Sequence, residues 1–126
     1  MKYDEFIARV AEYAGMSGAE ADKLTWATLG TLAERISGGE ARDLAAQLLL
    51  PLKDALVPAS EEAEGFSFEE FVRRTAARAE TDVGLAETAV DAVLATLRDA
   101  VTPGEFDDVM SQLPQDFKRV GAPRRG

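Results

Sequence analysis

The side chains of this chain that could do chemistry are mainly carboxylates. Histidine and cysteine are both absent, which removes the commonest general base, the thiol nucleophile and the ligands of most zinc and iron sites. Acid–base catalysis or metal binding would fall to aspartate and glutamate, which together number 23 against 14 lysines and arginines. Carboxylates placed close together can serve as a general acid/base pair, a calcium loop or a helix cap.

Most of the acidic clusters consist of residues that are neighbours in the sequence. They are the pairs Glu69 with Glu70 and Asp107 with Asp108, and the group Glu61, Glu62 and Glu64. Adjacent residues of a helix point about 100° apart, so the two pairs are not expected to form acid/base dyads. The stretch "SEEAEG" only faintly matches the alternating oxygens of a calcium loop, and a solvated linker is the favoured interpretation. We therefore expect no catalytic residue, no metal site and no cofactor, and the chain is not expected to be an enzyme.

One phrase with glutamates occurs twice. "SGGEARDLAAQL" at 37–48 returns in altered form as "TPGEFDDVMSQL" at 102–113. Ser37 with Glu40 and Thr102 with Glu105 have the spacing of a capping box, in which the hydroxyl accepts from the N3 amide and the glutamate reaches back. The alternative is a pair of anion sites, because glycine-flanked helix starts bind phosphate. A glutamate at each start disfavours an anion, so structural caps are favoured.

Other helix starts carry similar signals. The predicted structural caps are Ser17, Ser37, Glu40, Ser67, Asp82, Thr102 and Glu105. Lys2, which matches Ser67 in the other copy, has no side-chain acceptor for a cap. Phe66, just before Ser67, could pack on Phe71 as a hydrophobic staple.

The whole chain is organised by this duplication. Residues 3–48 align with 68–113 without a gap, and 15 of the 46 pairs are identical. Apolar residues recur at helical spacing in three segments of each copy, at 3–14, 21–36 and 41–48 and again at 68–79, 86–101 and 106–113. The predicted fold class is all-α: a compact helical bundle built from two tandem three-helix repeats with a pseudo-twofold relation.

Length sets the expected domain organisation. The 126 residues are expected to form a single domain, in which a first repeat (1–57) and a second repeat (66–120) are joined by an acidic linker (57–65) and followed by a flexible tail (121–126). A unit of about 60 residues is marginal alone, so the two repeats are expected to share one core. Pro51 and Pro114 interrupt the third helix of each repeat, and "PLKDAL" and "QDFKRV" after them are expected to close the bundle.

Charge narrows the range of partners. The net charge is −9 and neither half is basic, so nucleic acid is not an expected partner. The basic residues at the end, Lys118, Arg119, Arg124 and Arg125, are interpreted as a solvated terminus. No stretch approaches the roughly 18 apolar residues of a membrane span. A cytoplasmic protein, a monomer or weak homodimer without a membrane partner, is expected.

Trp26 is the one aromatic residue that breaks the repeat pattern, because its counterpart is Asp91. The favoured interpretation is that Trp26 fills the seam between the repeats. The alternative is a contact for a partner protein, since tryptophan is enriched at interaction hot spots.

Three stretches carry a resemblance to a known family. "YDEFIARVAEYAG", "TLAERISGGEARDLAAQL" and "TPGEFDDVMSQLPQDFKRV" resemble the bacterial family called domain of unknown function 2267. The resemblance implies an all-helical duplicated domain with no established activity. The expected function is a non-catalytic protein-interaction or regulatory module, and the alternative is a small-ligand binder with an apolar cavity between the repeats.

Overall fold

The computed structural model describes residues 1–58 and 60–117. Within these ranges the regular elements are six α-helices and one short 3-10 helix, with no strand, which confirms the all-α class. They are α1 Tyr3–Ala14, α2 Gly18–Arg35, α3 Gly38–Ala45, η1 Leu52–Leu56, α4 Phe68–Ala79, α5 Val83–Ala100 and α6 Pro103–Ser111. The tail at 121–126 and the four basic residues from Lys118 onward lie outside the described residues.

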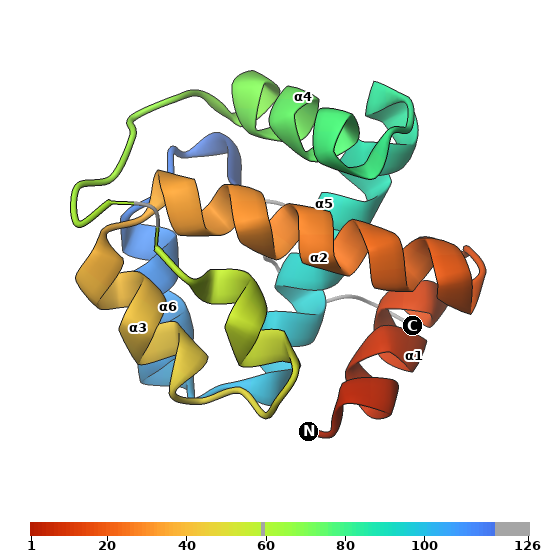
Figure 1. The fold of residues 1–126 in the computed structure, drawn as a ribbon, viewed down its shortest axis with the longest axis horizontal. Coiled ribbons are helices and arrows are strands. Elements are labelled where there is room, and N and C mark those ends of the chain that lie inside the picture. Colours follow the sequence, from red (N-terminus) through yellow and green to blue (C-terminus); the bar gives the residue numbers. More distant parts are fainter. Residues whose placement is uncertain (59, 118–126) are drawn as a thin grey trace.

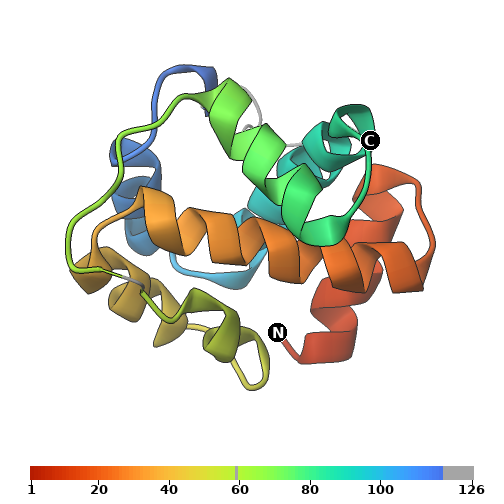
Figure 2. The ribbon, with the colours of Figure 1, turned by 45° about the horizontal axis from the view of Figure 1, so that its top comes forward.

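The helices of the two repeats cross over each other. The long helices α2 and α5 lie against each other, α1 packs on both α2 and α5, and α4 packs on both α5 and α2. Figure 1 shows α2 crossing the middle of the molecule, with α4 along one side and α3 and η1 on the other. The same order is visible from the second direction in Figure 2. Each first helix is therefore held partly by the other repeat.

The core follows the helical spacing of the sequence. Apolar side chains from both repeats form one buried cluster, and its largest fully buried members include Phe6 of α1 and Phe71 of α4. These two residues are identical partners in the repeat. The shared cluster removes from water the apolar stripe of each helix, which is the main source of stability for short helices.

Ion pairs between the repeats also occur at matching positions. Arg9 of α1 lies 3.2 Å from Asp99 of α5. The residues at the equivalent positions of the other repeat are Arg74 of α4 and Glu34 of α2, which lie 3.4 Å apart. Arg78 binds Glu34 more closely, at 3.0 Å.

Side-chain caps begin the helices. Ser17 Oγ accepts from Glu20 N at 3.2 Å, Ser67 Oγ from Glu70 N at 3.1 Å, and Asp82 Oδ1 from Leu85 N at 2.7 Å. At α1 the Lys2 side chain makes no cap bond, but its backbone N–H donates to Glu5 Oε1 at 3.2 Å. The Phe66 and Phe71 rings lie 6.2 Å apart, in agreement with a staple at the start of α4.

The ends of the first helices differ in one instructive way. Both α1 and α4 end with a residue in the left-handed conformation, Gly15 at φ 66° and Glu80 at φ 54°. Glycine adopts this conformation freely, whereas a residue with a Cβ is strained there. The second repeat thus keeps the same turn with a less suitable residue.

The third helix of each repeat ends several residues before the proline that was expected to interrupt it. The prediction placed their ends near Leu48 and Leu113, but α3 ends at Ala45 and α6 at Ser111. The following amides bond three residues back, as Leu48 N does to Ala45 O at 3.0 Å, so the last turn tightens instead of continuing the helix. After these turns, η1 buries Leu52 and Leu56.

One aromatic residue packs the segment after α6 against the core. Phe117 is fully buried, and its ring lies edge-on 4.9 Å from Phe68 and from Phe71. Residues 118–120 of the predicted closing segment "QDFKRV" lie outside the described residues. In the described part of the chain, no helix is both long enough and apolar enough to cross a bilayer.

Candidate functional site

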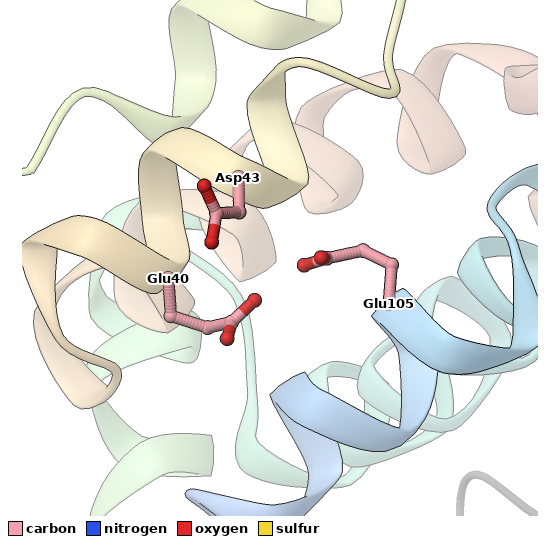
Figure 3. Close-up of side chains that lie close together, drawn as sticks. All are labelled: Glu40, Asp43 and Glu105. Carbon is pink, nitrogen blue, oxygen red and sulfur yellow. The ribbon is translucent and has the colours of Figure 1, made fainter.

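Three carboxylates converge where α3 meets α6. Glu40 and Asp43 project from α3, and Glu105 projects from α6 on the opposite side (Figure 3). One carboxylate oxygen from each residue can be chosen so that all three atoms lie within 4.8 Å of one another. The cluster therefore joins the first repeat to the second.

Local sequence explains the position of each carboxylate. Ser37 Oγ accepts from Glu40 N at 3.1 Å, and Thr102 Oγ1 accepts from Glu105 N at 3.3 Å. These caps fix the first turns of α3 and α6 and so place both glutamates beside each other. Asp43 lies three residues after Glu40, which puts it on the same helix face.

The capping boxes predicted for α3 and α6 are only half formed. The hydroxyl bonds are present, but the predicted return bonds from the glutamates are wrong. The backbone N–H of Ser37 donates to Gln112 Oε1 at 2.7 Å, and the N–H of Thr102 donates to Gln47 Oε1 at 2.8 Å. Each cap amide is thus occupied by a glutamine of the other repeat. The glutamates do not reach back to the caps, and their carboxyls instead face each other across the junction.

Glutamine amides complete the same contacts. Gln112 Nε2 donates to Ser37 Oγ at 3.3 Å, and Gln47 Nε2 donates to Thr102 Oγ1 at 3.2 Å. Gln47 and Gln112 themselves occupy equivalent positions of the two repeats. We call this pair of two-bond contacts the glutamine clamp. It fixes the position of α3 relative to α6 and therefore the distance between the carboxylates.

The carboxylates are poorly compensated. Glu105 is only 8% exposed, and the Oε2 atoms of both Glu40 and Glu105 are buried without a hydrogen-bond partner in the described part of the protein. Burial raises the pKa of Glu40 to about 8, and Glu105, Asp108 and Asp43 act in the same direction. A buried carboxyl beside other carboxyls holds its proton or attracts a positive ion.

This arrangement has a limited chemical repertoire. Oxygen donors at this spacing suit a hard cation or a shared proton. An anion at these two helix starts is disfavoured, because the carboxylates face the space it would enter. The anion alternative raised by the glycine-flanked sequence therefore has no support in the geometry.

Three glutamates of the other acidic clusters, Glu61, Glu64 and Glu70, are paired with arginines. Glu70 binds Arg74 at 3.0 Å, and Glu64 binds the same arginine at 3.2 Å. In the linker, Glu61 accepts from Arg42 at 2.6 Å and 2.8 Å. These partners leave the linker glutamates less suited to calcium than the junction carboxylates are.

Trp26 is bonded within its own repeat. Its indole N–H donates to Tyr3 Oη at 2.9 Å, and the Tyr3 hydroxyl in turn donates to Asp22. The indole is partly buried. Its polar edge is therefore tied to α1 of the first repeat, so the hydrogen bonding gives no support to a role in the seam.

A recess between the repeats lies at the turn after α4. It is lined by Glu20, Lys23 and Leu24 of α2 and by residues 79–81 and Leu85 of the second repeat, and its volume is about 70 Å³. Drug-sized ligands occupy pockets of roughly 300 Å³ or more. This recess is too small and too charged for the apolar ligand of the alternative function.

Several residues of the junction were missed by reasoning from sequence. Asp43, Gln47 and Gln112 belong to the identical pairs of the repeat, which do not by themselves indicate a site, and the spacing of Glu40 and Glu105 predicts only caps. The available signal was that Glu40, Asp43 and Gln47 all recur unchanged at the equivalent positions of the second repeat. Local rules for helix starts account for a glutamate at each of these positions. They do not predict that its carboxyl faces another helix.

Comparison with known proteins assigns the chain to one family. A search of curated proteins finds no match to this chain. The model of one family, described as "Uncharacterized conserved protein (DUF2267)", matches residues 3–120. That match spans both repeats, the glutamine clamp and all three carboxylates of the junction. The chain therefore belongs to the DUF2267 family of uncharacterised conserved proteins.

Proposed function

We propose that this protein is a non-catalytic regulatory module that responds to a ligand at the junction of α3 and α6. One observation carries the proposal: the Glu105 carboxylate, 8% exposed, faces Glu40 from the other repeat and has an oxygen without a partner. The lack of histidine and cysteine in the sequence supports the non-catalytic part.

Uncompensated carboxyls make the junction responsive. Burying a polar oxygen without a partner costs free energy, and two nearby carboxylates repel each other. A ligand that compensates this charge binds the folded state and raises its stability. Because the carboxylates come from different repeats, such a ligand strengthens the contact between them.

The same contacts support a pseudo-twofold relation between the repeats, which we include in the proposal. The two halves of the glutamine clamp match each other between the repeats, and so do the Arg9–Asp99 and Arg74–Glu34 pairs. In this arrangement the axis passes between α3 and α6. A regulatory ligand near the axis contacts both repeats, through Glu40 and Asp43 of the first and Glu105 of the second.

The test neutralises the buried carboxylate. In chelator-treated protein at pH 9, above the raised pKa of Glu40, we expect Glu105→Gln to raise the unfolding free energy by about 1 to 3 kcal/mol. The amide removes the repulsion and can donate to Glu40. Asp107→Asn, an equal change of charge at an exposed position of the same helix, should leave stability within about 0.5 kcal/mol.

Urea denaturation measures the stability, and hydrogen exchange locates the effect. The proposal predicts slower exchange in the first turns of α3 and α6 of the Glu105→Gln variant. A fall in stability on that substitution, or an equal gain with Asp107→Asn, contradicts it.

A second candidate function is docking of a protein partner at an apolar corner around η1. Leu49, Leu50 and Val57 are 54%, 64% and 70% exposed. They lie before and after η1 in the chain, and exposed large apolar side chains are typical of interaction surfaces when they form one patch. Partner capture by the intact chain should be lost in the Leu49→Ser, Leu50→Ser double variant and kept when exposed Val83 is changed to Ser. Trp26→Asp tests the tryptophan as a separate partner contact.

A further inference from the structure

The donor set at the α3–α6 junction is made only of oxygen. Glu40, Asp43 and Glu105 each offer a carboxylate, and the three ligand atoms lie within 4.8 Å of one another. Hard divalent cations such as Ca²⁺, Mg²⁺ and Mn²⁺ prefer oxygen ligands, whereas zinc and copper favour nitrogen and sulfur. The chemistry of the set therefore selects a class of ion.

The second observation is the state of Glu105. It is more than nine-tenths buried, with 8% of its surface exposed, and its Oε2 atom has no partner in the described residues. Its side chain points toward Glu40 and Asp43 (Figure 3). The carboxyl of Glu105 shares a hydrogen bond with that of Glu40, but its buried Oε2 atom is left without a partner, and a cation between the carboxylates would compensate it. The cluster is thus more than a group of surface acids.

Size is also compatible with a bound ion. Two ligands of one ion lie at most twice the metal–oxygen distance apart, which is about 4.6 to 5.2 Å for Ca²⁺ and about 4.0 to 4.2 Å for Mg²⁺. The limit of 4.8 Å between the three oxygens lies within the calcium range for each pair. Three oxygens all at that limit would each have to move by only a few tenths of an ångström to bind one Ca²⁺ together.

Solvent access and local charge fit the same ion. Asp43 is exposed, so the site opens to solvent on its α3 side and leaves room for water ligands. Within residues 1–58 and 60–117, no salt bridge involves the three carboxylates. Arg42, on the same helix as Glu40, is bound to Glu61 instead.

We propose that Glu40, Asp43 and Glu105 bind a hard divalent cation, with Ca²⁺ as the best fit, and that the ion joins the two repeats. This inference rests on the proposed function, because it names the ligand class of the same junction. The remaining coordination positions are filled by water. The glutamine clamp holds α3 and α6 at the spacing that the ion needs.

The test titrates chelator-treated full-length protein with CaCl₂, MgCl₂ and MnCl₂ at constant ionic strength and pH 8. Calorimetry should show one binding site, and the thermal midpoint should rise with cation concentration. Glu105→Gln and Asp43→Asn should each weaken binding by about tenfold or more. Asp107→Asn, the matched control on α6, should bind as the unchanged protein does.

Location is tested independently with Mn²⁺ as a paramagnetic probe. Amide signals in the first turns of α3 and α6 should broaden first, and Glu105→Gln should abolish the effect. Equal binding by the Glu105→Gln variant overturns the inference, because the ion then lies elsewhere. Absence of binding at millimolar cation also overturns it, while a gain of stability in metal-free Glu105→Gln would still uphold the responsive junction.

Discussion

Glu105 shows how the surroundings of a single residue differ from what its sequence neighbours suggest. Thr102 and Glu105 read as a local cap, and the Thr102 hydroxyl does accept from the Glu105 amide. The carboxyl itself is buried against another helix. Its chemistry is therefore decided by Glu40, which lies in the other repeat and far away along the chain.

The pH dependence of stability should report on Glu40. Its pKa is raised to about 8 in the folded protein from an ordinary value of 4.5, so the folded state keeps a proton that the unfolded state releases. The contribution to stability is fully present below pH 4.5 and is lost as the pH rises to about 8. Urea denaturation of chelator-treated protein should show this decline, and Glu40→Gln should flatten it.

Glu34 acts in the opposite direction and in another pH range. Its hydrogen bond with Arg78 holds the pKa of this carboxyl below its usual value, against a smaller opposing effect of burial. The stability from this pair is present above the unfolded pKa and is lost as the pH falls through the folded pKa. A decline between pH 5 and 8 that persists in Glu40→Gln would show that Glu40 is not its source.

Glu80 offers a prediction about the backbone. It holds φ at 54°, in the left-handed region where a residue with a Cβ costs about 1 to 2 kcal/mol. Glu80→Gly should therefore stabilise the protein by about 1 kcal/mol, as measured by urea denaturation. The complementary change, Gly15→Ala in α1, should destabilise it by a similar amount, and a loss of stability in Glu80→Gly would contradict the assignment of strain.

At the scale of helices, the glutamine clamp makes α3 and α6 depend on each other. Each glutamine accepts a hydrogen bond from a cap amide of the other repeat, Gln112 from Ser37 and Gln47 from Thr102. The bonds of Gln112 are partly buried, whereas those of Gln47 are exposed, where water can replace a lost partner. The same chemistry should therefore have different energetic value at the two sites.

The clamp prediction is a graded pair of substitutions. Gln112→Ala should cost about 1 to 2 kcal/mol, because a partly buried N–H is left unpaired, and Gln47→Ala less than about 1 kcal/mol. Gln115→Ala, at an exposed position nearby, is the control. Thermal or urea unfolding gives the order, and equal costs for all three variants would show that the clamp contributes nothing to stability.

The sequence predicts the starts of α2, α4 and α5 correctly, because the cause is local. Ser17, Ser67 and Asp82 begin helices because a side-chain oxygen needs only an amide three residues ahead. The prediction is wrong at Glu40. The spacing predicts that Glu40 accepts from the backbone N–H of Ser37, but in the fold this N–H donates to Gln112, which lies beyond the end of another helix. The carboxylate cluster depends on the packing of α3 on α6, which no local rule contains.

At the scale of the whole molecule, the two repeats share their contacts. The first helix of each repeat packs on the second helix of the other, and the buried cluster draws on both. A repeat on its own leaves these apolar faces in water. The duplicated sequence predicts the set of helices, whereas the crossover between repeats follows only from their packing.

A fragment experiment tests this dependence. Residues 1–60 expressed alone should lack cooperative unfolding, because α1 and α2 lose their packing against α5 and α4 and a unit of this size is marginal. Circular dichroism during urea titration makes the measurement. Addition of a fragment of residues 61–126 should restore cooperative unfolding. A stable, cooperative monomer of the first fragment alone would contradict a shared core.

The crossover also assigns a role to the linker at 57–65. The repeats bind each other through α1 with α5 and α4 with α2, so the connecting peptide sets their effective concentration, in addition to the backbone bonds of Glu61 and Glu64 to Gly38 and Glu34. The cost of lengthening such a connection grows slowly, by about 0.6 kcal/mol for each doubling. Evolution can therefore place insertions between the repeats, beyond the bonds of Glu61 and Glu64, without rebuilding the core.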